Sequence, residues 1–334
     1  MTLDPKAVGM LSRGWYGERL EAEECVYLLT FREKSPVANL CISLADRLMH
    51  AQSANTGRVA ADITVSTGPC PGNCGFCRWN EARCPEAFDY MPDDELAKLC
   101  EYAGAYSDVT EIRLGAIEST PVEDLAHFVE VASESSREGT LISIDFGDLD
   151  RKSCDILRKA GASDAYHSCR LGEGKDTDIK PQKRRETIDG LIAAGFRTTV
   201  GTEPIGPEHS PKEIVDNFFE YLDTDAKHAE VRGRETVLGS RMDSTISPAR
   251  LAQIKAVLTL GSSWKSQSAY GFPLVQPYIL GKNVARAQYS MKDWRAQTEA
   301  ARRRLFNAGF ERILLSDGST ADLSLSYLKQ TGSI

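Results

Sequence analysis

Apolar and polar positions along the chain follow two periods, one typical of strands and one typical of helices. Short runs of apolar and β-branched residues recur from residue 61 onward, as expected for strands. Amphipathic segments with apolar positions three and four residues apart lie between most of these runs and predict helices. The predicted strands are 61–66, 109–114, 141–146, 165–168, 196–201, 229–232, 266–271 and 284–290. The predicted helices are 93–105, 122–135, 151–160, 185–194, 212–222 and 248–260.

This alternation of strand and helix predicts the fold class. Repeated β-then-α units imply parallel strands joined by right-handed crossovers. Six to eight such units indicate an α/β fold of the (β/α)8 TIM-barrel type, complete or nearly so. Residues 1–58 show only helical spacing. We therefore expect an N-terminal helical extension over 1–58, a barrel over 59–300, and a C-terminal helix and tail packed on the barrel over 301–334.

Composition limits the class of partner. With 334 residues and 41% hydrophobic content, the chain is long enough for one large domain with a full core. A net charge of −8 disfavours binding to a phosphate backbone. No stretch approaches the roughly 20 apolar residues of a membrane span, and the first residues lack a signal-peptide pattern. The expected protein is cytoplasmic and binds neither nucleic acid nor membrane.

The cysteines point to a metal centre. Their number is 9, which is odd, and the cytosol keeps thiols reduced, so disulfides are not expected. Cys70, Cys74 and Cys77 form a C-x3-C-x2-C pattern directly after a predicted strand, and Gly72 and Gly75 allow the loop to turn tightly. Thiolates hold iron–sulfur clusters. Three thiolates on a four-iron cubane leave one iron open to an exogenous ligand, as a catalytic centre requires.

Four alternatives remain open from the residues alone. In the first, zinc takes Cys84 as a fourth ligand, in the pattern C-x3-C-x2-C-x6-C, although structural zinc sites usually pair two short spacings. In the second, the cysteines are packing thiols without metal, and in the third the chain is a non-catalytic iron–sulfur or zinc scaffold. The fourth is a metal-free barrel enzyme such as a hydrolase, but no H-E-x-x-H or G-x-S-x-G motif is present.

The cysteine pattern, with Phe76 just before the last cysteine, resembles the signature of the radical S-adenosylmethionine (SAM) superfamily. The resemblance implies that a [4Fe–4S] cluster held by Cys70, Cys74 and Cys77 binds SAM through its amino and carboxylate groups. It implies reductive cleavage of SAM to methionine and a 5′-deoxyadenosyl radical, which abstracts hydrogen from a small molecule inside the barrel. It also implies an electron donor such as flavodoxin or ferredoxin, and it places Phe76 beside the cofactor.

Segments within residues 17–240 are similar to the group that contains biotin synthase, the hydrogenase maturase HydE and the methylornithine synthase PylB. In that group a glycine–acid segment receives the amino group of SAM, and Gly115 and Glu118 resemble it, although the usual Gly-Gly-Glu is absent. Arg184 matches the arginine that pairs with the SAM carboxylate. Gly201 and Ile205 resemble the stretch that backs the adenine. Alternatively, Arg184 is a surface charge, Glu118 is a first-turn helix acid, and the glycine serves a turn.

Further polar residues are expected at the barrel mouth. Asp145 ends a predicted strand, where barrel chemistry takes place. The resemblance implies that Glu173 accepts the ribose hydroxyls and that Arg170 holds substrate or an anion, although the Arg-x-Glu spacing is longer here by one residue. His167 is a catalytic candidate with a simple hydrogen-bonding role as its alternative.

The lack of cysteines for a second cluster narrows the class of reaction that we expect. Biotin synthase binds a second cluster through cysteines on barrel strands, whereas the corresponding positions here are Ile112 or Arg113, Ile142 or Ser143, and Thr199. Sulfur insertion is therefore not expected. The resemblance implies a single-cluster enzyme of cofactor or amino-acid biosynthesis, either a HydE-like maturase or a PylB-like mutase.

Overall fold

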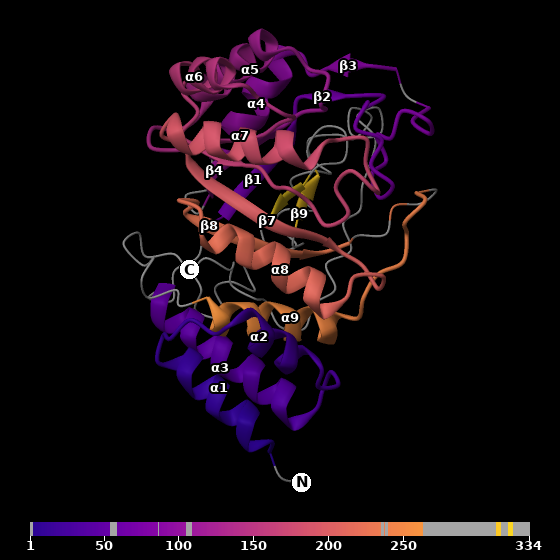
Figure 1. Cartoon of the computed structure of the whole chain (residues 1–334). Helices are drawn as coiled ribbons and strands as arrows, with labels where there is room; N and C mark the ends of the chain where they lie inside the picture. The colour runs from indigo at the N-terminus through magenta and orange to yellow at the C-terminus, as the bar shows by residue number, and fades with distance from the viewer. Residues whose placement is uncertain are drawn as a thin grey trace. The chain divides into compact units, whose positions relative to one another are not determined.

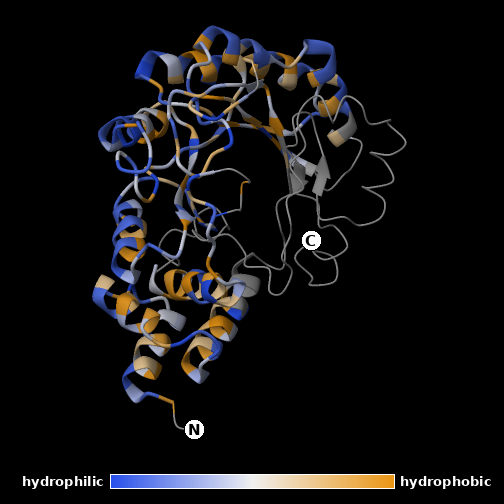
Figure 2. Ribbon diagram, turned by 90° about the vertical axis from the view of Figure 1, so that its right-hand side faces the viewer, coloured by the Kyte–Doolittle hydropathy of each residue, from blue (hydrophilic) through white to orange (hydrophobic). Residues whose placement is uncertain are grey.

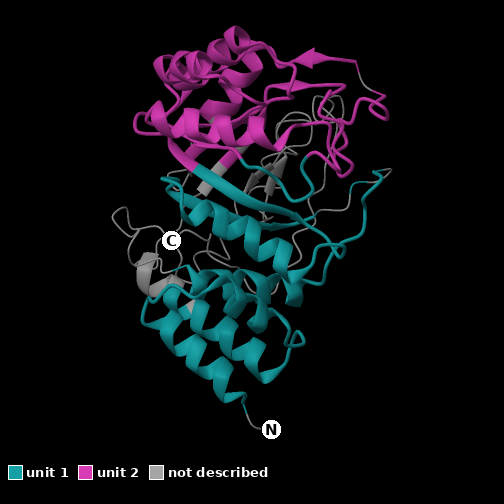
Figure 3. Cartoon of the chain, in the orientation of Figure 1, with its two compact units in different colours: residues 1–56, 168–173, 199–283 teal, residues 57–167, 174–198, 284–334 magenta. Residues whose placement is uncertain are grey.

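The computed structural model describes residues 3–53, 59–85, 87–104, 109–234, 237, 240–262, 312–314 and 320–322. The chain divides into two compact units, which Figure 3 colours teal and magenta. Unit 1 comprises residues 1–56, 168–173 and 199–283, and unit 2 comprises residues 57–167, 174–198 and 284–334.

Unit 2 is an α/β unit built on parallel strands (Figure 1). Strand β1 pairs with β4, β4 with β5, and β5 with β6, all in parallel. Strand β10 pairs antiparallel with β1, and β9 with β10. The strands are β1 (Val59–Thr64), β2 (Ser66–Thr67), β3 (Asp89–Tyr90), β4 (Val109–Gly115), β5 (Leu141–Asp145), β6 (Asp164–Tyr166), β9 (Arg312–Leu314) and β10 (Thr320–Asp322). The helices are α4 (Asp93–Gly104), α5 (Val122–Ser135), α6 (Arg151–Ala160) and α7 (Pro181–Ala193).

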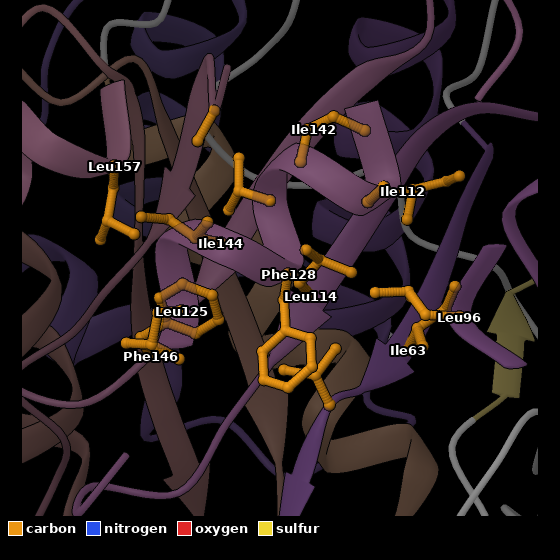
Figure 4. Close-up of a cluster of buried hydrophobic side chains, with 14 of the residues drawn as sticks. Ile63, Leu96, Ile112, Leu114, Leu125, Phe128, Ile142, Ile144, Phe146 and Leu157 are labelled. Atoms are coloured by element: carbon orange, nitrogen blue, oxygen red, sulfur yellow. The ribbon is translucent and has the colours of Figure 1, made fainter. Parts of the chain in front are cut away.

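Apolar and polar side chains alternate along the strands, which explains why one face of this sheet packs against helices. Ile112 and Leu114 on β4 and Ile144 on β5 are buried, and they belong to one hydrophobic core with Leu125 and Phe128 of α5. Figure 4 shows these side chains gathered between strands and helices. Each fully buried side chain of this size contributes about 1.5–3 kcal/mol. The intervening strand positions carry Glu111, Arg113 and Ser143, so the opposite face of the sheet is polar.

Local signals set the ends of α6. The side chain of Asp150 accepts a hydrogen bond from the Ser153 N–H at 2.7 Å, which satisfies a free donor of the first turn. Gly161 closes the helix with φ +119°, a left-handed conformation that favours glycine.

Unit 1 contains helices packed on one another and a pair of parallel strands. Its elements are α1 (Pro5–Trp15), α2 (Ala22–Leu29), α3 (Pro36–Ser53), β7 (Arg197–Ile205), α8 (Pro211–Leu222), β8 (His228–Gly233) and α9 (Pro248–Gly261), with Arg197 and Thr198 of β7 lying in unit 2. Helix α9 lies against α3, and α2 lies against α8. A Cβ at Gly14 would lie 2.5 Å from Leu260 O, so glycine permits the close approach of α1 to α9. In Figure 2 the helices carry both hydrophilic and hydrophobic residues, as their amphipathic patterns predict.

The α/β class is confirmed. Among the described residues, six strands, β1, β4, β5, β6, β7 and β8, pair in parallel, which is consistent with part of a TIM-type barrel. These correspond to the first six predicted strands, whereas 266–271 and 284–290 lie outside the described residues. The expected C-terminal helix also falls outside them, and the described residues of 301–334 form β9 and β10.

A search of the described helices finds none with the length and apolar content that crossing a membrane requires.

Candidate cofactor site

The cysteine loop starts where β1 ends. The Val65 N–H donates to Gly115 O at 2.8 Å, so the backbone stays beside β4 for one more residue. The chain then turns at Gly68, with φ +130°, where a Cβ would lie 2.6 Å from the Cα of Phe88. Only glycine fits this turn without displacing the neighbouring backbone. The sequence therefore delivers the cysteines to the carboxyl end of β1, as predicted.

Backbone hydrogen bonds fold the three cysteines into one compact loop. The Cys70 N–H donates to Trp79 O at 2.7 Å, and the Cys77 N–H donates to Cys74 O at 3.1 Å. The Asn80 side-chain amide donates to Cys74 O at 3.3 Å. The Trp79 N–H points at the Cys77 sulfur, 3.4 Å away. An amide N–H directed at sulfur stabilises a thiolate, which is the form that binds iron.

None of the nine cysteines forms a disulfide bond in this structure. Cys74 is buried, whereas Cys70, Cys77 and Cys84 are partly exposed. Over the part of the chain that the structure describes, no three Cys, His, Asp or Glu side chains converge closely enough to hold a single metal ion. A cubane is larger than one ion and takes its thiolates at separate corners. The donor set of this loop, three thiols with an amide aimed at one of them, suits such a cluster.

A buried charge cluster lies elsewhere in unit 2, and we call Glu118, Asp148, His167 and Arg184 the Arg184 cluster. The guanidinium of Arg184 lies 3.2 Å from Glu118 Oε2 and 3.1 Å from Asp148 Oδ1. His167 Nε2 lies 3.3 Å from both the Arg184 guanidinium and Asp148 Oδ1. The side chain of Arg184 is only 4% exposed, so it is not the solvated surface charge that the sequence left open.

Two features of the backbone bring the two carboxylates together. A Cβ at Gly147 would lie 2.8 Å from the Glu118 carboxyl carbon, so glycine lets this loop contact Glu118. The Asp148 N–H then donates to Glu118 Oε1 at 2.8 Å. Helix α5 begins at Val122, so Glu118 precedes the helix and is not a residue of its first turn.

The surroundings of Asp148 keep it ionised. Burial opposes its ionisation, but the hydrogen bond with His167 and the charge of Arg184 outweigh burial and hold the pKa of the carboxyl below its ordinary value. One guanidinium therefore faces two carboxylates. Such a group can receive a ligand that carries both an ammonium and a carboxylate, because each ligand charge finds its opposite.

Unit 1 holds a second set of predicted residues. Arg170 Nε donates to Glu203 Oε1 at 3.2 Å, and the Arg170 N–H donates to Glu173 Oε2 at 3.0 Å. Arg232 on β8 lies 3.9 Å from Glu203 Oε2 and also pairs with Glu230. The Leu171 N–H donates to Glu203 O at 2.7 Å, which fixes the loop after β6 to the end of β7.

The remaining predicted residues occupy strand ends or the cysteine loop. Gly115 and Asp145 are the last residues of β4 and β5. The Ala116 N–H donates to Asp145 O at 3.2 Å, which joins the two strand ends. Gly201 and Ile205 lie in β7, with Ile205 as its last residue. Phe76 lies in the cysteine loop and is partly buried.

The structure thus groups Glu118, His167 and Arg184 in unit 2 and groups Arg170 with Glu173 in unit 1. Sequence reasoning missed Asp148 and Glu203. Asp148 follows β5 and Glu203 lies near the carboxyl end of β7, and those positions were the available signal.

Comparisons with known proteins report on the fold. No family model and no curated protein matches the chain. Among solved structures, the [FeFe]-hydrogenase maturase HydG from Carboxydothermus hydrogenoformans has a TM-score of 0.66 at 14% identity, covering 81% of this chain and 70% of HydG. Methylornithine synthase (PylB) has a TM-score of 0.66 at 16% identity, covering 90% of this chain and 96% of PylB. Streptococcus suis SuiB bound to S-adenosylmethionine has a TM-score of 0.51 at 12% identity, covering 76% of this chain and 59% of SuiB. At these identities the likeness concerns the fold alone, and the chain has the fold that HydG and PylB share.

Proposed function

We propose that this chain is a radical SAM enzyme that cleaves S-adenosylmethionine reductively and abstracts hydrogen from a small molecule. The observation that carries the proposal is one folded loop at the end of β1 that holds three cysteines, none of them in a disulfide, in the pattern C-x3-C-x2-C. The likeness of the fold to PylB, and to SuiB bound to S-adenosylmethionine, supports it.

Cys70, Cys74 and Cys77 would hold a [4Fe–4S] cluster through three of its irons. When bound and reduced, the cluster supplies one electron to SAM, which yields methionine and a 5′-deoxyadenosyl radical. The loop contributes the amide hydrogen bond from Trp79 to the Cys77 sulfur, which offsets negative charge on the thiolate. Phe76 would lie beside the cofactor.

The Arg184 cluster suits the amino-acid part of SAM. Arg184 would pair with the carboxylate and Glu118 with the amino group, because the two side chains already lie 3.2 Å apart with opposite charge. Asp148 contacts the same guanidinium at 3.1 Å and would keep it oriented when Glu118 turns to the ligand. His167 is the catalytic candidate of this cluster, and it is buried in contact with both Asp148 and Arg184.

The resemblance assigns further roles to residues of unit 1 and of the strand ends. Glu173 would accept the ribose hydroxyls, while Gly201 and Ile205 on β7 would back the adenine. Arg170 would bind substrate or an anion. Its partner Glu203 is shared with Arg232, so this group offers both charges to a small polar molecule. Gly115 and Asp145 would line the same end of the sheet as the cysteine loop.

The finer assignment is a reaction of cofactor or amino-acid biosynthesis, of the HydE-like maturase or PylB-like mutase type. A cytoplasmic electron donor such as flavodoxin or ferredoxin would reduce the cluster. The sequence positions that would bind a second cluster carry no cysteine, which favours hydrogen abstraction over sulfur insertion.

The test is anaerobic reconstitution of the full chain with iron and sulfide. We expect four irons per chain, as a [4Fe–4S] cluster requires, and release of 5′-deoxyadenosine when dithionite and SAM are added. The Cys74→Ala variant should lose both properties, whereas the Cys84→Ala variant should keep them. A zinc-binding chain without 5′-deoxyadenosine, or loss of metal in Cys84→Ala equal to that in Cys74→Ala, would support the scaffold alternative and overturn the proposal.

A further inference from the structure

A segment far along the chain backs the cysteine loop within unit 2. Residues 174–180 follow the loop after β6 and lead into α7. The Gly75 N–H donates to Asp176 O, and the Asp178 N–H donates to Gly72 O, each at 2.8 Å. These two bonds hold the cysteine loop at both sides of Cys74.

Close packing at Gly72 adds to these bonds. A Cβ on Gly72 would lie 2.9 Å from Ile179 Cδ1, so the backbone of the loop rests directly on the Ile179 side chain. Ile179 is itself buried. The contact therefore excludes water on this side of the loop and leaves little space for the loop to move toward the segment.

Asn73 connects three parts of the site. It lies between Cys70 and Cys74 and adopts φ +47°, a left-handed conformation that asparagine tolerates better than most residues. Its side-chain amide donates to Asp178 Oδ2 at 2.8 Å. Its side-chain oxygen accepts the Glu81 N–H at 3.0 Å. One side chain thus joins the cysteine loop to the turn after Cys77 and to the segment before α7.

The segment that carries Asp178 is itself ordered by its own contacts. The buried Thr177 hydroxyl accepts the N–H groups of Gly174 at 3.1 Å and Ile179 at 3.3 Å. Helix α7 begins at Pro181, so Asp178 lies only a few residues before Arg184 on the same chain segment. A displacement of Asp178 would therefore also move the cysteine loop and the start of the helix that carries Arg184.

We propose that Asn73 and Asp178 form a clamp that fixes the cysteine loop in the shape that retains the cluster. Both are positioning residues, since neither would touch iron or SAM. The inference rests on the proposed function and extends it, because it assigns a role to two polar residues that are not cluster ligands. In their hydrogen bond the Asn73 amide is the donor and an Asp178 carboxylate oxygen is the acceptor.

Four variants distinguish loss of the clamp from a general effect on folding. Asn73→Gly keeps the left-handed backbone conformation accessible and removes the side-chain bonds. Asp178→Ala removes the acceptor at an exposed position, whereas Asp178→Asn keeps an acceptor oxygen for Asn73. Glu81→Ala is the matched control, because only the backbone N–H of Glu81 joins the clamp.

Each variant is reconstituted anaerobically, and two properties are measured. The first is the rate at which iron passes to a ferrous chelator, and the second is the electron paramagnetic resonance spectrum of the reduced cluster with and without SAM. We expect iron to leave Asn73→Gly and Asp178→Ala up to roughly tenfold faster than wild type, since one lost hydrogen bond costs about 0.5–1.5 kcal/mol. Their spectra should broaden or shift. Asp178→Asn and Glu81→Ala should stay within about twofold of wild type, a margin well below the 1.4 kcal/mol of a tenfold change.

The outcomes distinguish the two claims. A wild-type chain that takes up no cluster overturns the proposed function and the clamp together. A wild-type chain with a cluster, and Asn73→Gly and Asp178→Ala variants that match it in iron release and spectrum, overturns the clamp alone. Equal loss in Asp178→Ala and Asp178→Asn would also overturn it, because the acceptor oxygen would then be irrelevant.

Discussion

Replacing Arg184 with alanine is expected to destabilise the chain even when no cofactor is bound. Arg184 lies 3.2 Å from Glu118 and 3.1 Å from Asp148, and its side chain is 4% exposed against 20% and 19% for the two carboxylates. Without the guanidinium, two largely buried carboxylates lose the positive group that lies within 3.2 Å of both. The loss is thus mainly the cost of the unpaired charges left behind.

The exposed fractions of the three side chains set how much unfolding free energy the Arg184→Ala variant should lose. Removing one partner of a fully buried ion pair costs about 3–5 kcal/mol. Since both carboxylates retain some contact with water, we expect about 2–3 kcal/mol here. An unfolding entropy of about 2.1 cal/mol/K per residue gives roughly 0.7 kcal/mol/K for 334 residues. The melting temperature should therefore fall by about 3–4 °C.

The assay is thermal unfolding of the cofactor-free chain, followed by circular dichroism. Lys183→Ala is the matched control, because it removes a positive charge from the same helix at a side chain that is 65% exposed. That variant should melt within about 1 °C of wild type, as exposed ion pairs contribute less than about 1 kcal/mol. If Arg184→Ala melted with the control, Arg184 would not be neutralising buried carboxylates and the reasoning would be wrong.

Three further predictions rest on single contacts. Gly14→Ala should lower the melting temperature, because the new Cβ would lie 2.5 Å from the backbone oxygen of Leu260, and overpacking of this kind costs about 1–3 kcal/mol. Ser210→Ala should cost about 1 kcal/mol in urea unfolding, because its hydroxyl caps the first turn of α8. The unfolding free energy, measured as the pH is lowered, should show a contribution from Asp148. Burial opposes ionisation of this carboxyl, but the His167 hydrogen bond and the charge of Arg184 outweigh burial, so the pKa of Asp148 in the folded chain lies below its ordinary value. That contribution is present above the ordinary pKa and is lost as the pH falls through the folded pKa, and Asp148→Asn should remove it.

The fold was predictable because the apolar residues recur with the period of a strand or a helix, and these are the residues that the structure buries. Ile112 and Leu114 alternate with polar neighbours, and both are buried against helices as the period of two requires. The left-handed glycine that closes α6 was likewise predictable, since few other residues adopt its φ of +119°. Such features depend on residues close together in the sequence.

The site was predictable only in part, because its contacts join residues distant in the sequence. The cysteine spacing indicated the loop, and the resemblance supplied Glu118 and Arg184. Nothing in the local pattern indicated that Asp148 would share the same guanidinium, since that depends on where the loop after β5 meets α7. The bond from Asn73 to Asp178 spans 105 residues and has no sequence signal of its own.

The central claim is that three cysteines leave one iron of a cubane open for SAM. The most direct measurement is electron–nuclear double resonance on the reduced cluster of the reconstituted chain, with SAM labelled with ¹⁷O in its carboxylate and ¹⁵N in its amino group. We expect hyperfine coupling from both labels in the wild-type chain and in Cys84→Ala. A cluster that shows neither coupling, with a fourth side chain of the protein bound to the remaining iron, would contradict it.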